Sequence, residues 1–159
     1  MGLISSTRRE KGLLGPFVQL TKPRLSMMSV ASAVFGYFSA VPEQRDTVLF
    51  LSLLVGTALA AGGAAALNQW MEIKEDGLMR RTADRPIPAG EVMPMHALAV
   101  GLLTSLAGLI ILWQGTNLHA MLLTLGVLFF YLALYTPLKK SSPLATEVGA
   151  ISGALPPLL

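Results

Sequence analysis

Long apolar blocks alternate with short polar segments along this chain. A membrane core about 30 Å thick needs roughly 20 apolar residues in a helix, and four blocks come near that length: 25–41, 47–71, 94–113 and 118–138. A fifth apolar run covers 143–159, and 151–159 within it reads as the beginning of another membrane helix. The pattern predicts an all-α fold, a polytopic membrane helical bundle of four transmembrane helices plus the start of a fifth.

The charged residues between the blocks predict the orientation of the bundle. Of the 12 Lys and Arg residues, Arg45 alone falls in the loop after the first block, and 114–117 carries none. Cytoplasmic loops are enriched in Lys and Arg, so we expect a multi-pass protein of the inner (cytoplasmic) membrane with a cytoplasmic N-terminus. Residues 1–24 form a cytoplasmic arm in this interpretation, and 25–159 form the transmembrane domain.

Composition narrows the functional class. Hydrophobic residues make up 53% of the chain and charged residues only 13%, which requires lipid as the solvent. The chain has no cysteine, so a thiolate metal site and a cysteine nucleophile are excluded. A net charge of +3 is too small to indicate a nucleic-acid partner.

The polar segment after the second block carries candidate metal ligands. Asn68, Glu72 and Asp76 follow one another at intervals of four residues. At 3.6 residues per turn they share one face of a helix. A carboxamide and two carboxylates are hard oxygen donors, which suit Mg²⁺ bound together with phosphate oxygens.

Three arginines follow the carboxylates: Arg80, Arg81 and Arg85. A guanidinium group binds phosphate oxygens in a bidentate fork. Acidic and basic groups this close together at a membrane surface therefore indicate a metal-bridged diphosphate. From spacing alone, a solvated loop with internal ion pairs explains the same charges.

Several motifs together resemble the UbiA-type prenyltransferase superfamily, and within it the haem O synthase branch. The segments 68–72 (NQWME), 76–82 (DGLMRRT) and 85–86 (RP) are similar to the first Asn/Asp-rich motif of the superfamily. Further segments are similar to the haem O synthase branch: 21–24 (TKPR), 135–140 (YTPLKK), 148–150 (VGA) and 153–158 (GALPPL). The resemblance covers nearly the whole chain from Thr21 onward.

The resemblance implies a bundle around a central cavity and an enzyme that transfers a farnesyl group from farnesyl diphosphate to a vinyl group of haem b. It implies that Asn68, Glu72 and Asp76 are the catalytic ligands of Mg²⁺–diphosphate. It also implies haem A synthase or oxidase-assembly proteins as partners. The residues it implies for diphosphate binding are Arg80, Arg81, Arg85, Tyr135, Lys139 and Arg24.

The chain departs from the superfamily in one respect, since the second aspartate-rich motif does not occur in it. We therefore expect this chain by itself to be inactive or weakly active. Two alternatives remain at this point: a prenyltransferase with another acceptor, such as a quinone-precursor aromatic or chlorophyllide, and a non-catalytic transport or assembly protein. The blocks 25–41, 94–113 and 118–138 contain no charge, which argues against transport.

The loop charges lead to a topology prediction. Residues 72–93 and 139–142 should be cytoplasmic, and 42–46 and 114–117 periplasmic. A single cysteine at Gln44 of this cysteine-free chain should react with a membrane-impermeant thiol reagent from the periplasmic side only. Reaction at position 44 from the cytoplasmic side would overturn the assignment.

Overall fold

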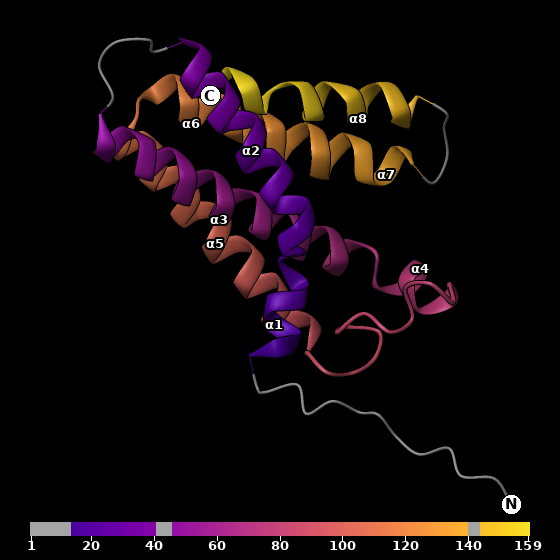
Figure 1. Ribbon diagram of the computed structural model, residues 1–159. Coiled ribbons are helices and arrows are strands. Elements are labelled where there is room, and N and C mark those ends of the chain that lie inside the picture. The colour runs from indigo at the N-terminus through magenta and orange to yellow at the C-terminus, as the bar shows by residue number, and fades with distance from the viewer. Residues whose placement is uncertain (1–13, 41–45, 140–143) are drawn as a thin grey trace, which may run out of the picture.

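The computed structural model describes residues 14–40, 46–139 and 144–159, and every regular element in these segments is helical (Figure 1). The all-α prediction is confirmed. The elements are α1 (Gly15–Leu20), α2 (Pro23–Ala40), α3 (Thr47–Met71), α4 (Ile73–Leu78), α5 (Pro94–Gly115), α6 (Leu118–Phe129), the π-helix η1 (Phe130–Tyr135), α7 (Thr136–Leu138), α8 (Ala145–Ala154) and the 3-10 helix η2 (Pro156–Leu158).

Three stretches of the described chain are long and apolar enough to cross a membrane: α3, α5 and Leu118–Leu138, in which α6, η1 and α7 are continuous. They match three of the four predicted spans. The fourth prediction, 25–41, falls on α2, an 18-residue helix whose first turn carries Pro23 and Arg24 and which is less apolar than the other three. The structure therefore supports three spans by length and composition.

The fifth apolar run differs from the expectation. We expected a helix to begin at residue 151, but α8 begins at Ala145 and ends at Ala154. Proline cannot donate a backbone hydrogen bond and clashes with the preceding turn. Pro156 and Pro157 follow directly, and the chain continues there as the short helix η2.

Helices α3 and α5 lie side by side over most of their length (Figure 1). Glycines on both helices make this close approach possible. A Cβ atom at Gly108 of α5 would lie 2.6 Å from the Gly56 carbonyl oxygen, and one at Gly101 would lie 2.7 Å from Leu67 Cγ. Association of helices in lipid depends on such small residues, because apolar side chains gain nothing by leaving the lipid.

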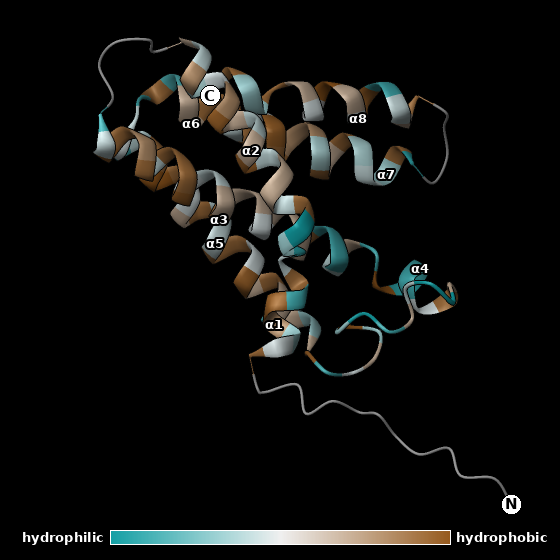
Figure 2. Cartoon of the chain, in the orientation of Figure 1, coloured by the Kyte–Doolittle hydropathy of each residue, from teal (hydrophilic) through white to brown (hydrophobic). Residues whose placement is uncertain are grey.

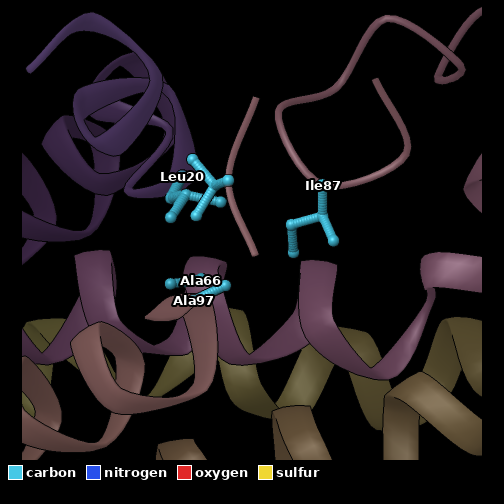
Figure 3. Packing of buried hydrophobic residues seen from close by; sticks show 5 residues of the cluster. Leu20, Ala66, Ile87 and Ala97 are labelled. Carbon is cyan, nitrogen blue, oxygen red and sulfur yellow. The ribbon is translucent and has the colours of Figure 1, made fainter. Parts of the chain in front are cut away.

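A compact apolar cluster attaches α1 and the loop after α4 to the end of this helix pair. Its buried members are Leu20, Ala66, Ile87, Val92 and Ala97 (Figure 3). They come from α1, α3, the loop and α5. The cluster therefore brings the polar loop against the end of α3.

Polar and apolar surfaces are segregated along the bundle. Figure 2 shows hydrophilic residues gathered where α3 passes into α4 and the following loop, whereas α3 and α5 are mostly hydrophobic. Large apolar side chains such as Phe35, Leu103 and Leu122 are exposed on the helices. A surface of this kind is stable in lipid, as expected of a membrane protein.

The α3–α5 contact leads to a stability prediction. A Cβ atom at Gly63 would collide with Ser105 Oγ and lie 2.7 Å from the Gly101 carbonyl oxygen. Gly63→Ala should therefore push the helices apart and destabilise the protein by about 1–3 kcal/mol. Thermal unfolding in detergent micelles measures the loss.

Gly126→Ala on α6 is the matched control, because its Cβ would meet nothing within 4 Å. It should be neutral or stabilising by up to about 1 kcal/mol, since alanine favours the helix. Equal unfolding midpoints for the Gly63 variant and the wild type would contradict the close-packing interpretation.

Candidate functional site

The candidate site begins where α3 ends. Helix α3 stops at Met71, Glu72 has non-helical dihedral angles (φ −107°, ψ 14°), and α4 starts at Ile73. The prediction of one continuous helical face through Asn68, Glu72 and Asp76 is therefore wrong at its last step. The first two side chains remain in contact, because Asn68 Nδ2 donates a hydrogen bond of 2.9 Å to Glu72 Oε2.

Both carboxylates are buried, and each is paired with a cation. Glu72 forms an ion pair with Lys139 at the end of α7, and Asp76 forms one with Arg85 in the loop after α4. The carboxylate side chains are only 5% and 6% exposed, whereas Lys139 and Arg85 are 32% and 23% exposed. A buried charge without a partner is strongly destabilising, so these two pairs hold distant segments together.

A hydroxyl group joins α3 to α7. Thr136 Oγ1 lies 3.0 Å from Asn68 Oδ1 and 2.8 Å from the Tyr131 carbonyl oxygen, so its one proton is shared between two acceptors. Thr136 is almost fully buried. The Asn68 amide is consequently held at both ends, by Thr136 and by Glu72.

The π-helix η1 shapes the opposite wall. Short π-helical segments within α-helices occur frequently at functional sites. The rings of Tyr131 and Tyr135 are stacked, with centroids 5.6 Å apart and planes at 15°. The Lys139 ammonium nitrogen lies 5.6 Å from the Tyr135 ring centroid, within cation–π range.

These groups surround a polar cavity of about 680 Å³. Three cations and one carboxylate reach its lining, and the second carboxylate, Asp76, is paired with one of those cations. The cavity therefore favours an anionic ligand. Its lining consists of Lys22, Asn68, Glu72, Arg85, Tyr131, Tyr135, Lys139, Ala145, Thr146 and Gly149.

An apolar cavity of about 270 Å³ adjoins the polar one. Lys22 and Tyr131 line both. Small side chains on α3 leave the space open, namely Ala60, Ala61, Ala64 and Ala65. The two cavities together suit a molecule with an anionic head and an apolar chain.

Lys22, between α1 and α2, belongs to the segment 21–24 (TKPR) but was not among the site residues expected from the sequence. Its backbone has a φ of 44°, a left-handed conformation that is costly for a residue with a Cβ. Burial of the ammonium group and the positive charge of Arg85 lower its pKa to about 8, although Asp76 and Glu72 act in the opposite direction. Lys22 is thus a cation held at a cost beside the carboxylates.

Gln69 holds the segment before Lys22 in place. Its side-chain Nε2 donates to the Leu20 carbonyl oxygen at 2.9 Å, at the C-terminal end of α1. Gln69 is buried on α3, next to Asn68. Hydrogen bonding across 49 residues of sequence could not have been found from local spacing.

The structure brings together part of the predicted site. Asn68, Glu72, Arg85, Tyr135 and Lys139 line the polar cavity, and Asp76 is paired with Arg85. The other three predicted residues are exposed and do not line either cavity: Arg24, Arg80 and Arg81. Sequence reasoning missed Lys22, Gln69, Tyr131 and Thr136, of which all but Tyr131 lie within motifs used for the resemblance.

The oxygen ligands available at the site suit Mg²⁺. The described residues contain no group of three His, Cys, Asp or Glu side chains that could by itself hold a metal. Mg²⁺ does not require one, because it commonly binds one or two carboxylates and takes its other ligands from phosphates and water. Glu72 and Asp76 supply such carboxylates, and Asn68 adds an amide oxygen.

The sequence of this chain is similar to those of known proteins. Residues 29–159 match the sequence profile of the UbiA prenyltransferase family. Protoheme IX farnesyltransferase of Opitutus terrae is 46% identical over 98% of this chain and 52% of its own length. The protein of the same name from Solibacter usitatus is 41% identical over 90% of this chain and 52% of its own length.

A solved structure shares the fold. The structure of a digeranylgeranylglyceryl phosphate synthase superposes with a TM-score of 0.80 at 16% sequence identity. The match covers 91% of this chain and 51% of that one. This chain spans about half the length of the curated relatives it matches.

The position of Lys22 leads to a pH prediction. Without Mg²⁺ or diphosphate, amine-specific labelling of Lys22 followed by mass spectrometry should reach half its maximum near pH 8, because only the neutral amine reacts. In the unfolded chain the midpoint should move to about 10.4. Between these values the unfolded state binds more protons, so the free energy of unfolding should rise with pH.

Added diphosphate should raise the Lys22 midpoint, since a nearby anion favours the charged amine. A midpoint that is the same in the folded and unfolded chain would show that Lys22 is not buried beside Arg85.

Proposed function

Because the chain belongs to the UbiA prenyltransferase family, we propose that it provides the diphosphate-binding half of an intramembrane farnesyltransferase. The reaction joins the farnesyl group of farnesyl diphosphate to a vinyl group of protohaem IX (haem b), giving haem O and diphosphate. The observation that carries the proposal is the cation-rich polar cavity that adjoins an apolar cavity. The names of the relatives support the choice of farnesyl donor and haem acceptor.

Binding of the diphosphate exchanges ion-pair partners. Without a ligand, Lys139 and Arg85 neutralise Glu72 and Asp76. When the substrate enters, both cations turn to phosphate oxygens, which they bind through charge-assisted hydrogen bonds. Lys22, between α1 and α2, adds a third cation to the cavity lining. These cations stabilise diphosphate as the leaving group.

The carboxylates released by this exchange are the proposed Mg²⁺ ligands. Glu72 and Asp76 would hold the ion, with Asn68 oriented by Thr136 beside them. Bound Mg²⁺ would neutralise charge that develops on the departing diphosphate. Arg80 and Arg81 lie on the exposed loop between Asp76 and Arg85, where we propose that they attract the anionic substrate to the mouth of the site.

The apolar cavity takes the farnesyl chain. Four alanines form most of its wall on α3, and their methyl groups do not react with an allylic cation. Enclosure of the chain also excludes water, which would otherwise capture the cation. We place the protein in the inner membrane with the polar cavity and the 72–93 loop on the cytoplasmic side, because of the loop charges.

The alternative acceptors would give different products, but each would use the same binding site for the prenyl diphosphate. No residue of the described chain distinguishes haem b from a quinone-precursor aromatic or chlorophyllide. The choice of haem b as the acceptor therefore follows from the names of the relatives. The product assay described next tests this choice when the other acceptors are offered in parallel.

The carboxylate pair provides the test of the proposed function. In membranes that contain the full-length gene product, Glu72→Gln and Asp76→Asn should each lower haem O formation by about 10²–10³-fold. This is the usual cost of losing one electrostatic stabiliser of the transition state. Chromatography of the haem products after incubation with farnesyl diphosphate, haem b and Mg²⁺ measures the effect.

Asp84→Asn is the matched control, because Asp84 is an exposed carboxylate of the same loop and lines neither cavity. It should retain nearly full activity. Wild-type rates in both the Glu72 and the Asp76 variants would show that the two buried carboxylates serve only the fold.

A further inference from the structure

We propose that the Tyr131 ring stabilises the positive charge on the allylic carbon during farnesyl transfer, and that Tyr135 positions this ring. The inference rests on the proposed function and adds a catalytic residue to it. Neither Tyr131 nor its ring stack was recognised as functional in the sequence.

Tyr131 lies where the two cavities adjoin. It lines both cavities, as only Lys22 also does among the described residues. In a substrate with its diphosphate in one cavity and its chain in the other, the bond that breaks lies at their junction. Tyr131 and Lys22 are therefore the side chains nearest the reacting carbon.

Of these two residues, Tyr131 is the one suited to a positive charge on the reacting carbon. A lysine ammonium repels a developing cation and suits the phosphate, whereas the face of an aromatic ring attracts a cation. Among the described residues that line either cavity, Tyr131 and Tyr135 are the only aromatic ones. The nearby Phe129 is 57% exposed on the outside of the helix and lines neither.

The local structure explains how the ring is held. In the π-helix η1, Tyr131 and Tyr135 stack almost in parallel, at 15°. Because stacking occupies one face of the Tyr131 ring, a ligand in the cavities would meet the other face. Helix α8 supports the stack at Gly149, where an added Cβ atom would lie 3.0 Å from Tyr135 Cε2.

One ring of the stack, Tyr135, already lies close to a cation in this structure. The Lys139 ammonium lies 5.6 Å from the Tyr135 centroid. An ammonium group and an allylic cation are both attracted by the negative face of the ring. The stack is therefore suited to positive charge at this end of the cavity.

The reaction balances as follows. The bond between C1 of the farnesyl chain and oxygen breaks, and its electron pair leaves with diphosphate. The π electrons of the acceptor vinyl group form the new carbon–carbon bond to C1, which leaves the positive charge on the other carbon of the vinyl group. Water then adds to that carbon as a hydroxyl group and releases a proton to solvent. Tyr131 acts on the first of these cations.

The test replaces the ring in the full-length gene product and compares catalysis with binding. Tyr131→Leu should lower kcat by roughly tenfold to thirtyfold, as expected for a desolvated cation–π contact. Tyr131→Phe should stay within about threefold of the wild type, because it keeps the ring face. Binding of farnesyl thiodiphosphate, an analogue that ionises poorly, should be unchanged in both variants.

Controls separate this role from structure. Phe129→Leu removes a neighbouring ring from the lipid-facing side and should leave kcat unchanged. Gly149→Ala should displace Tyr135 and lower kcat. Equal kcat in Tyr131→Leu and the wild type, or loss of analogue binding together with kcat, would overturn the inference. A full-length wild-type gene product that releases no diphosphate from farnesyl diphosphate would overturn the proposed function and the inference with it.

Discussion

Two buried ion pairs determine how this site is built. Glu72 and Asp76 are almost completely removed from water at the end of a membrane helix, so each needs a cation close by. The cations come from different parts of the chain, Lys139 after the fourth apolar block and Arg85 from the loop after α4. Because buried carboxylates without cations would be destabilising, the end of α3, the loop after α4 and the end of α7 must meet at one place.

The same pairs explain how a charged cavity persists without its ligand. A free carboxylate beside an apolar cavity would be destabilising, and so would a free cluster of cations. Pairing neutralises most of the charge and leaves Lys22 as the additional cation, at a lowered pKa and with a strained backbone. Strain of this kind is often found at functional sites. Here it coincides with the junction between the two cavities.

Close helix packing and open space occur on the same helix, α3. Glycines on one face allow contact with α5, whereas alanines on another line the apolar cavity. Apolar volume alone does not hold a bundle together in lipid, and small residues supply the contact that does. One run of small residues, 60–66, therefore serves both packing and binding.

The sequence by itself determined the helical class, three membrane-spanning segments and most of the charged groups of the site. Hydrophobic periods and charge spacing are local properties, so Thr47–Met71 and Leu118–Leu138 could be placed directly. The tertiary structure decided which charges are used. It places Lys22 and Tyr131 in both cavities and leaves Arg24, Arg80 and Arg81 outside. Those outcomes depend on a helix break at Glu72, a π-helical turn and hydrogen bonds across dozens of residues, such as Gln69 to Leu20. Each is set by the balance of burial and pairing among distant segments, which no local pattern records.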